Sequence, residues 1–203
     1  MKKRKKRGWI EVICGPMFCG KTEELIRRLR RTEIARLNVQ VFKPSGDNRY
    51  SPDELVVHPG AGVIRHTAIA VPDTRTLLKL VDPRTNVLGI DEAQFFDRTI
   101  ADGCNELANN GIRIIVAGLD MDFRGEPFGS IPILMAQAEQ VDKLHAICTF
   151  KDPDGRICGK EAMYTQRIIN GKPAPWDAPT VVIGAEDVYQ ARCRRHFKRP
   201  KKL

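Results

Sequence analysis

Short apolar segments alternate with segments of helical periodicity along the first two thirds of the chain. Trp9–Cys14 (WIEVIC) is typical of a short buried strand, and Asn38–Phe42 (NVQVF) alternates apolar and polar side chains as a second strand would. Between these strands, Thr22–Leu37 carries leucine and isoleucine at helical spacing, Ile34 among them, which predicts a helix.

The same alternation continues downstream. Asn86–Asp91 (NVLGID) and Ile112–Leu119 (IRIIVAGL) indicate two further buried strands. Asp97–Asn110, which Gly111 stops, is predicted to be a helix between them. Because apolar strands that alternate with helices build parallel sheets, we expect an α/β fold with a mostly parallel sheet and helices on both faces.

Two segments interrupt this alternation. Lys43–Gly62 is rich in Pro, Gly, Asp and Ser, which predicts a long irregular loop. Asp73 is expected to cap a helix that continues to Val81.

The pattern changes after about Leu144, where helical periodicity fades and short β-like runs such as Met163–Ile169 and Thr180–Ile183 replace it. We therefore expect a larger α/β domain followed by a small β-rich domain. With the basic ends, the expected divisions are residues 1–8, 9–144, 145–197 and 198–203.

The net charge of +9 is concentrated at the two ends of the 203-residue chain. Residues 2–7 carry six basic side chains and residues 192–203 carry seven, which leaves a net charge of about −4 on residues 8–191. Such ends either bind polyanions nonspecifically or are simply solvated. No apolar run approaches the roughly 20 residues of a membrane span, and Glu11 breaks the one that follows the basic start. We expect a cytoplasmic protein.

Gly15–Thr22 (GPMFCGKT) fits the phosphate-binding pattern G-x-x-x-x-G-K-[ST] in full. Glycines let successive backbone N–H groups point at phosphates, and the helix that follows adds its positive N-terminal end. Lys21 is the expected contact of the β- and γ-phosphates, and the Thr22 hydroxyl is an expected magnesium ligand. An ordinary strand-to-helix turn is the alternative, but the motif lies between a predicted strand and a predicted helix. We therefore expect a P-loop, RecA-like domain that binds ATP with magnesium.

The apolar strand that ends at Asp91 supplies the partner of this loop. In P-loop enzymes an acid at that position holds magnesium, directly or through water. Glu92 follows, and a carboxylate there could accept a proton from an incoming nucleophile. That nucleophile is water in an ATPase and a substrate hydroxyl in a kinase, and this motif does not separate the two. The guanine-specificity pattern [NT]-K-x-D is absent from the sequence, which weighs against a GTPase.

Four metal-binding side chains lie in the predicted β-rich part: Cys148, Cys158, Cys193 and His196. Three Cys and one His would form a closed, structural zinc site, and Cys193 and His196 have a usual ligand spacing. The first pair is separated by nine residues, where two to four are usual. The alternative is four unrelated side chains, but a small β domain gains stability from a metal.

Several strings together resemble the type II thymidine kinases, the family of the cytosolic mammalian enzyme. They are GPMFCGKTEELIRRLRR, FKPSGDNRY, IDEAQFF, GLDMDFRGEPFG, YTQR and VIGAEDVY-x3-C-x2-H. The resemblance runs from about Trp9 to His196. It implies ATP-dependent phosphorylation of the 5′-hydroxyl of thymidine or deoxyuridine, in nucleotide salvage for DNA synthesis. It also implies a homotetramer, inhibited by thymidine triphosphate, with no membrane and no specific nucleic acid as a partner.

The resemblance also assigns residues. Glu92 is the catalytic base, Thr22 and Asp91 serve magnesium, and Leu119–Phe128 is a lasso loop that closes over the base. The residues implied for ATP are Gly15, Pro16, Met17, Phe18, Cys19, Gly20, Lys21, Thr22, Asp47, Asp91, Glu92, Ala93 and Gln94. Those implied for the nucleoside are Met17, Phe95, Leu119, Phe123, Phe128, Thr165, Thr180, Val181, Val182, Ile183, Gly184 and Tyr189. The implied zinc ligands are Cys148, Cys158, Cys193 and His196.

The sequence departs from the family at Cys19, where the P-loop usually has serine. We expect Lys21 and the helix end to lower the pKa of this thiol, which would make ATP binding sensitive to oxidants or alkylation. The long Cys148–Cys158 loop is the other departure, and it either bulges from an intact site or marks a lost metal. A P-loop ATPase that binds nucleic acid through its zinc module and basic tails is the competing function. A catalytically dead nucleotide-binding module is a third.

Overall fold

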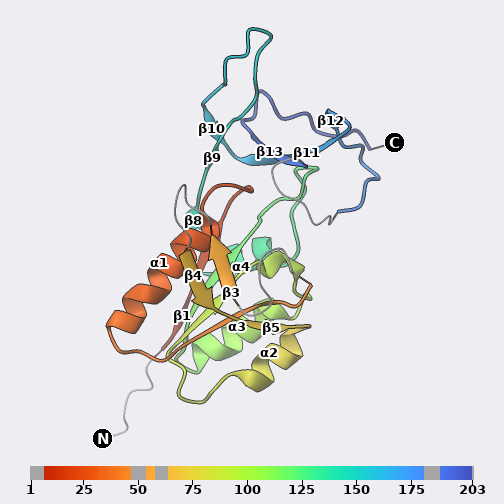
Figure 1. Cartoon of the computed structure of the whole chain (residues 1–203). Helices are drawn as coiled ribbons and strands as arrows, with labels where there is room; N and C mark the ends of the chain where they lie inside the picture. Colours follow the sequence, from red (N-terminus) through yellow and green to blue (C-terminus); the bar gives the residue numbers. More distant parts are fainter. Residues whose placement is uncertain (1–6, 47–53, 58–63, 181–187, 203) are drawn as a thin grey trace, which may run out of the picture.

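A six-stranded parallel sheet forms the centre of the protein in the computed structural model, which describes residues 7–46, 54–57, 64–180 and 188–202. The strand order is β5-β2-β6-β7-β1-β8, and each neighbouring pair is parallel. The strands are β1 (Trp9–Cys14), β2 (Val39–Pro44), β5 (Ile69–Val71), β6 (Val87–Ile90), β7 (Arg113–Gly118) and β8 (Gln140–Lys143) (Figure 1). The α/β prediction is confirmed.

Helices cover both faces of this sheet. They are α1 (Lys21–Ile34), α2 (Thr74–Leu80), α3 (Ile100–Asn109) and α4 (Ile131–Gln137). Because side chains alternate along β1, Ile13 packs with α1 in one apolar cluster, whereas Val12 packs with residues of α2, α3 and α4 in another. None of the helices in the described ranges is long and apolar enough to cross a bilayer.

Helix α1 ends earlier than its periodicity predicts. Ile34, one of the residues of the predicted stripe, is 82% exposed. Arg36 has a left-handed backbone (φ 58°), which stops the helix, although Leu37 beyond it still packs against the core. The helix prediction therefore extended three residues too far.

The predicted loop Lys43–Gly62 is wrong in part. Strand β2 continues to Pro44, and β3 (Glu54–Val57) forms an antiparallel hairpin with β4 (Ile64–Thr67). Leu55 is buried in the apolar cluster on the α1 side, so a short apolar run within a polar segment forms structure by packing. Residues 47–53 and 58–63, with Asp47 among them, lie outside the described residues.

The predicted cap of the following helix is correct. The Asp73 side chain accepts a hydrogen bond from the Thr76 N–H, and α2 ends at Leu80, one residue before the predicted end.

Separate small sheets follow β8. β9 (Ala146–Ile147) pairs with β10 (Glu161–Ala162), and β11 (Tyr164–Ile169) lies between β12 (Lys172–Pro173) and β13 (Tyr189–Arg192). The predicted strand over Met163–Ile169 is therefore present as β11. Thr180 lies outside any strand, and the rest of the second predicted run, residues 181–183, is outside the described part of the chain.

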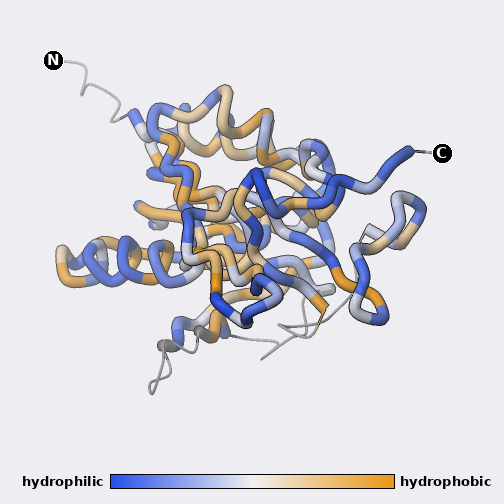
Figure 2. The backbone as a smooth tube through the Cα atoms, turned by 90° about the horizontal axis from the view of Figure 1, so that it is seen from above, coloured by the Kyte–Doolittle hydropathy of each residue, from blue (hydrophilic) through white to orange (hydrophobic). Residues whose placement is uncertain are grey.

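The C-terminal end is strongly hydrophilic (Figure 2) but is held against the protein. The Lys198 backbone N–H donates to Gln166 Oε1 at 2.7 Å, and Lys198 O accepts from the same side chain at 3.2 Å. The Arg199 guanidinium bonds to Glu126 in the lasso segment Leu119–Phe128. The expectation of a purely solvated tail therefore does not hold for residues 198 and 199.

Candidate functional site

The phosphate loop joins β1 to α1 and requires glycine at both ends. Gly15 and Gly20 have φ of 139° and 82°, and a Cβ at Gly15 would lie 2.3 Å from the Leu144 carbonyl oxygen. The Lys21 ammonium donates to the Pro16 carbonyl oxygen at 2.8 Å. The loop is therefore curled over the N-terminus of α1, with the lysine folded back upon it.

A threonine and a buried carboxylate meet beside this loop. Asp91 follows β6, and its Oδ2 accepts a hydrogen bond from the Thr22 hydroxyl at 2.9 Å. Asp91 is only 5% exposed. Burial, followed by the charge of Glu92, raises the pKa of its carboxyl group. A hydroxyl and an acid in this arrangement are hard oxygen ligands suited to magnesium.

Glu92 is held in a special backbone conformation next to Asp91. Its φ of 50° and ψ of 39° lie in the left-handed region, which is uncommon for residues other than glycine. The Gln94 side-chain amide donates to Glu92 Oε2 at 2.5 Å, and Gln94 Oε1 accepts from the Leu119 N–H at 2.9 Å. Gln94, in the single turn Ala93–Phe95 (η1), thus links the candidate base to the start of the lasso segment.

The expectation for Cys19 is wrong. Burial raises the pKa of this thiol, and the opposing effect of the Lys21 charge is smaller. Proximity to a lysine and a helix end is visible in sequence, whereas desolvation depends on the packing around the side chain. The predicted low-pKa, reactive thiol is therefore not supported.

Two contacts bring predicted nucleoside residues to the phosphate side. The Met17 N–H in the phosphate loop donates to the Thr165 hydroxyl of β11 at 3.0 Å. Phe95 of η1 and Phe128 of the lasso segment contact each other edge to face, with ring centroids 5.6 Å apart. Thr165 thus meets the phosphate loop, and Phe128 meets the turn that follows Asp91 and Glu92.

Phe123 is buried rather than open to a ligand. It is 3% exposed and packs with Ala174 and Ala178. The Arg124 and Arg167 guanidinium groups lie over its ring, 4.3 and 5.6 Å from the centroid. In this conformation its ring is covered by neighbouring side chains and does not form a free wall.

The remaining nucleoside residues are only partly described. Tyr189 is 7% exposed and pairs with Arg167 between β13 and β11. The Thr180 hydroxyl accepts a hydrogen bond from Arg124 at 2.9 Å. Four predicted contacts lie outside the described residues: Val181, Val182, Ile183 and Gly184.

Sequence reasoning missed the polar residues that hold these segments in place. Asp120 lies two residues after the end of β7. It is 5% exposed and forms an ion pair with Lys143 of β8 at 2.7 Å. Because β1 lies between β7 and β8, this ion pair reaches across the strand that leads into the phosphate loop. No role was predicted for Arg124 either. The signal for both Asp120 and Arg124 is their charge within the glycine-containing string GLDMDFRGEPFG.

The Cys and His residues predicted from sequence converge in the C-terminal part. The candidate ligand atoms of Cys148, Cys158, Cys193 and His196 all lie within 4.8 Å of one another. Both the Cys148 and Cys193 sulfurs are 3.6 Å from His196 Nδ1, and the Cys158 and Cys193 sulfurs are 4.0 Å apart. A tetrahedral zinc site with ordinary bond lengths has ligand-to-ligand edges of about 3.4–3.8 Å. This cluster fits zinc.

The long loop between the first two cysteines leaves this cluster intact. Lys151 pairs with Ile157, and the Cys158 N–H donates to the Phe150 carbonyl oxygen at 2.8 Å. These contacts close the extra residues into a hairpin that projects beyond β9 and β10 (Figure 1). The loop therefore bulges from an assembled set of four side chains.

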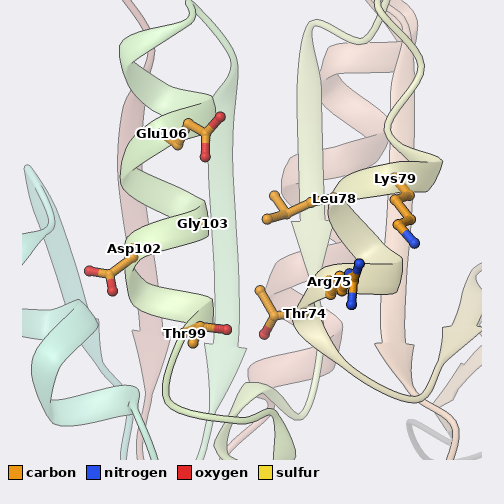
Figure 3. A pocket seen from close by; sticks show the side chains of 8 residues that line it. All are labelled: Thr74, Arg75, Leu78, Lys79, Thr99, Asp102, Gly103 and Glu106. Atoms are coloured by element: carbon orange, nitrogen blue, oxygen red, sulfur yellow. The ribbon is translucent and has the colours of Figure 1, made fainter.

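A separate hollow of about 400 Å³ lies between α2 and α3. Thr74 and Leu78 of α2 point toward α3 (Figure 3), and Gly103 of α3 lets the helices approach closely. A Cβ at Gly103 would lie 3.3 Å from Thr74 Cγ2. The residues that line this hollow include none of the predicted site residues, so we attribute it to the packing of two helices.

One comparison with known proteins bears on this arrangement. A family model described as Thymidine kinase matches residues 8–197. The match contains the phosphate loop, the two acids, the lasso segment and all four residues of the Cys/His cluster, and it spans nearly the whole chain. The chain therefore belongs to the thymidine kinase family.

Proposed function

We propose that this protein transfers the γ-phosphate of ATP to the 5′-hydroxyl of thymidine. Family membership supports a kinase with a nucleoside and ATP as substrates. The single observation that carries the specific proposal is the contact of Met17 with Thr165. It brings Thr165, one of the predicted nucleoside residues, against the phosphate loop, and direct transfer between two substrates requires such adjacent binding sites.

The donor half would use the phosphate loop and its two partners. Backbone N–H groups of the loop bind the phosphates, and Lys21 leaves the Pro16 carbonyl to contact the β- and γ-phosphates. Thr22 and Asp91 would hold magnesium, which neutralises charge on the phosphates. Both ligands are already in hydrogen-bond contact, so their positions need little adjustment.

The transfer step would use Glu92 as the general base. The 5′-oxygen of thymidine forms a bond to the γ-phosphorus while the bond from that phosphorus to the bridging β,γ-oxygen breaks, and ADP leaves. The hydroxyl proton passes to the Glu92 carboxylate. Gln94 positions this carboxylate by donating to Oε2.

The Cys/His cluster would hold a structural zinc. Four protein ligands leave no open position for substrate, so its contribution is to stability. Cys148 and Cys158 precede β11 in the sequence, and Cys193 and His196 follow β13. Zinc bound by all four would therefore anchor β11, the strand that carries Thr165. We propose that this part, residues 145–197, is a separate small domain.

Several finer points rest on the resemblance alone. We propose deoxyuridine as a second acceptor, thymidine triphosphate as an inhibitor, and a homotetramer as the assembly. The competing nucleic-acid ATPase would use the Cys/His cluster and the basic ends, but Lys198 and Arg199 of the C-terminal end are engaged with Gln166 and Glu126.

The rate of ADP formation separates these functions. We expect purified protein to hydrolyse ATP slowly alone or with single-stranded polynucleotide, and to form ADP rapidly when thymidine is added. Stimulation by polynucleotide without any response to thymidine would contradict the proposal and favour the ATPase.

A further inference from the structure

Arg124 lies at the tip of the lasso segment and has polar partners both within this segment and outside it. The segment turns back on itself, because Met121 pairs with Pro127 and the Asp122 N–H donates to the Glu126 carbonyl oxygen at 2.9 Å. Asp122 in turn accepts from the Arg124 backbone N–H and from its guanidinium, both at 2.8 Å. These two bonds to Asp122 fix the orientation of the Arg124 side chain.

In this orientation the Arg124 guanidinium also bonds to a second segment, Trp176–Thr180. Arg124 Nε donates to the Trp176 carbonyl oxygen at 2.7 Å, and Nη2 donates to the Ala178 carbonyl oxygen at 2.7 Å. Nη1 reaches the Thr180 hydroxyl at 2.9 Å. One side chain thus bonds to three residues of a segment that lies more than fifty positions away in the sequence.

The same guanidinium covers the aromatic ring of Phe123, and its side chain is only 13% exposed. Charge-assisted hydrogen bonds formed away from water are among the strongest polar contacts in proteins. Arginine suits this place because its planar fork presents five donors in fixed directions, whereas lysine presents three from a single nitrogen.

We propose that Arg124 is a positioning residue for the nucleoside acceptor, and the inference rests on the proposed function. It fastens the lasso segment to Trp176–Thr180, and thereby keeps these two segments in place for nucleoside binding. Its partners among the described residues all lie on these two segments, and none belongs to the phosphate loop. Loss of the fork should therefore weaken thymidine binding and leave ATP binding nearly unchanged.

Steady-state kinetics of Arg124→Lys and Arg124→Met in the full chain test this split. We expect Arg124→Lys to raise the KM for thymidine about tenfold, the effect of losing one charge-assisted hydrogen bond, with the KM for ATP within about twofold of the original. Arg124→Met should raise the KM for thymidine further. The matched control is Arg84→Lys, because Arg84 also bonds to an aspartate two residues earlier but is exposed in a remote turn.

Hydrogen exchange gives a readout that does not depend on activity. The amides of Trp176–Thr180 should exchange faster in Arg124→Lys than in the original protein or in Arg84→Lys. If Arg124→Met does not fold, Arg124→Lys decides, since it keeps the charge beside Asp122. An unchanged KM for thymidine, equal rises in both KM values, or unchanged exchange over Trp176–Thr180 would each overturn the inference. Absence of thymidine phosphorylation by the original protein would instead contradict the proposed function, and the exchange experiment would still judge the role of Arg124.

Discussion

Glu92 depends on contacts that motif spacing does not reveal. The motif places a carboxylate after Asp91, but the left-handed backbone at Glu92 and the hydrogen bond from Gln94 turn it to its position. Gln94 was assigned from sequence to the nucleotide. In the structure, the Gln94 amide joins the Glu92 carboxylate to the Leu119 backbone. These contacts support a role in positioning Glu92 rather than a direct contact with the nucleotide.

Replacement of Glu92 by glutamine should lower turnover while preserving nucleotide binding. The amide cannot accept the hydroxyl proton, so we expect kcat to fall on the order of 10²–10⁴-fold. ATP affinity, measured by calorimetry, should change little. Glu106→Gln on the exposed side of α3 is the control and should retain activity. Near-normal turnover of the Glu92 variant would contradict a role for Glu92 as the general base.

The contrast between Thr22 and Cys19 shows what sequence can predict for single residues. The Thr22–Asp91 contact follows from two motifs whose geometry is set by the strand and helix on which they lie. The Cys19 pKa depends on the balance of desolvation against charge, and burial of a loop side chain is not encoded by its immediate neighbours.

At the scale of elements, Glu11 joins three of them. The sequence shows it only as a break in the apolar run of β1. In the structure it is 3% exposed and accepts hydrogen bonds from Arg28 of α1 at 2.8 Å and from Arg113 of β7 at 2.6 Å. Trp9 Nε1 donates to it at 2.7 Å. This buried acid therefore secures the helix and the neighbouring strand to β1.

Glu11→Gln should destabilise the protein because the charge-assisted hydrogen bonds from Arg28 and Arg113 to the Glu11 carboxylate are weakened, although Arg28 keeps two other carboxylate partners. We expect the free energy of unfolding to fall by about 1.5–3 kcal/mol, which corresponds to a melting temperature roughly 3–12 °C lower. Glu33→Gln, which removes an exposed partner of His66, should change it far less. Equal melting temperatures for both variants would contradict this account of Glu11.

The same site predicts a pH dependence. Burial alone would raise the pKa of Glu11, but hydrogen bonds from Arg113 and Trp9 outweigh it, so the pKa lies below its ordinary value of 4.5. A depressed acid pKa stabilises the folded state above the unfolded-state pKa, and this stability is lost as pH falls through the folded-state value. The difference in unfolding free energy between the original protein and Glu11→Gln should therefore shrink as pH decreases below about 4.5.

The elements of the sheet were more predictable than the segments around it. β1, β6 and β7 are mostly apolar, with Glu11 in β1 and Arg113 at the start of β7 as the charged positions, as expected for strands buried on both faces. The edge strands β5 and β8, the short strands β3 and β4 and the seven-residue helix α4 were not predicted, because their stability comes from packing and pairing with other segments.

At the scale of the whole molecule, zinc would tie the C-terminal strands together. We expect purified protein to contain about one zinc per chain, and Cys158→Ser to lose the metal with a lower melting temperature. Cys19→Ser is the matched control, because Cys19 lies outside the four-residue cluster and should retain zinc. Metal analysis that finds zinc well below one per chain in the original protein would show that the cluster is not a zinc site.

The four ligands illustrate the reach and the limit of sequence reasoning for the whole molecule. Residue types identified Cys148, Cys158, Cys193 and His196 as a set, but the hairpin that accommodates nine intervening residues was visible only in three dimensions. The attachment of the lasso segment to Trp176–Thr180 through Arg124 likewise requires knowledge of the fold, since no local pattern pairs these segments.

Phosphate transfer itself is the most direct test of the central claim. The protein is incubated with magnesium, thymidine and ATP labelled in the γ-phosphate, and the products are separated. The account predicts that the label appears on the 5′-oxygen of thymidine as the monophosphate, in amounts equal to the ADP formed. Release of the label as inorganic phosphate, with thymidine recovered unchanged, would contradict it.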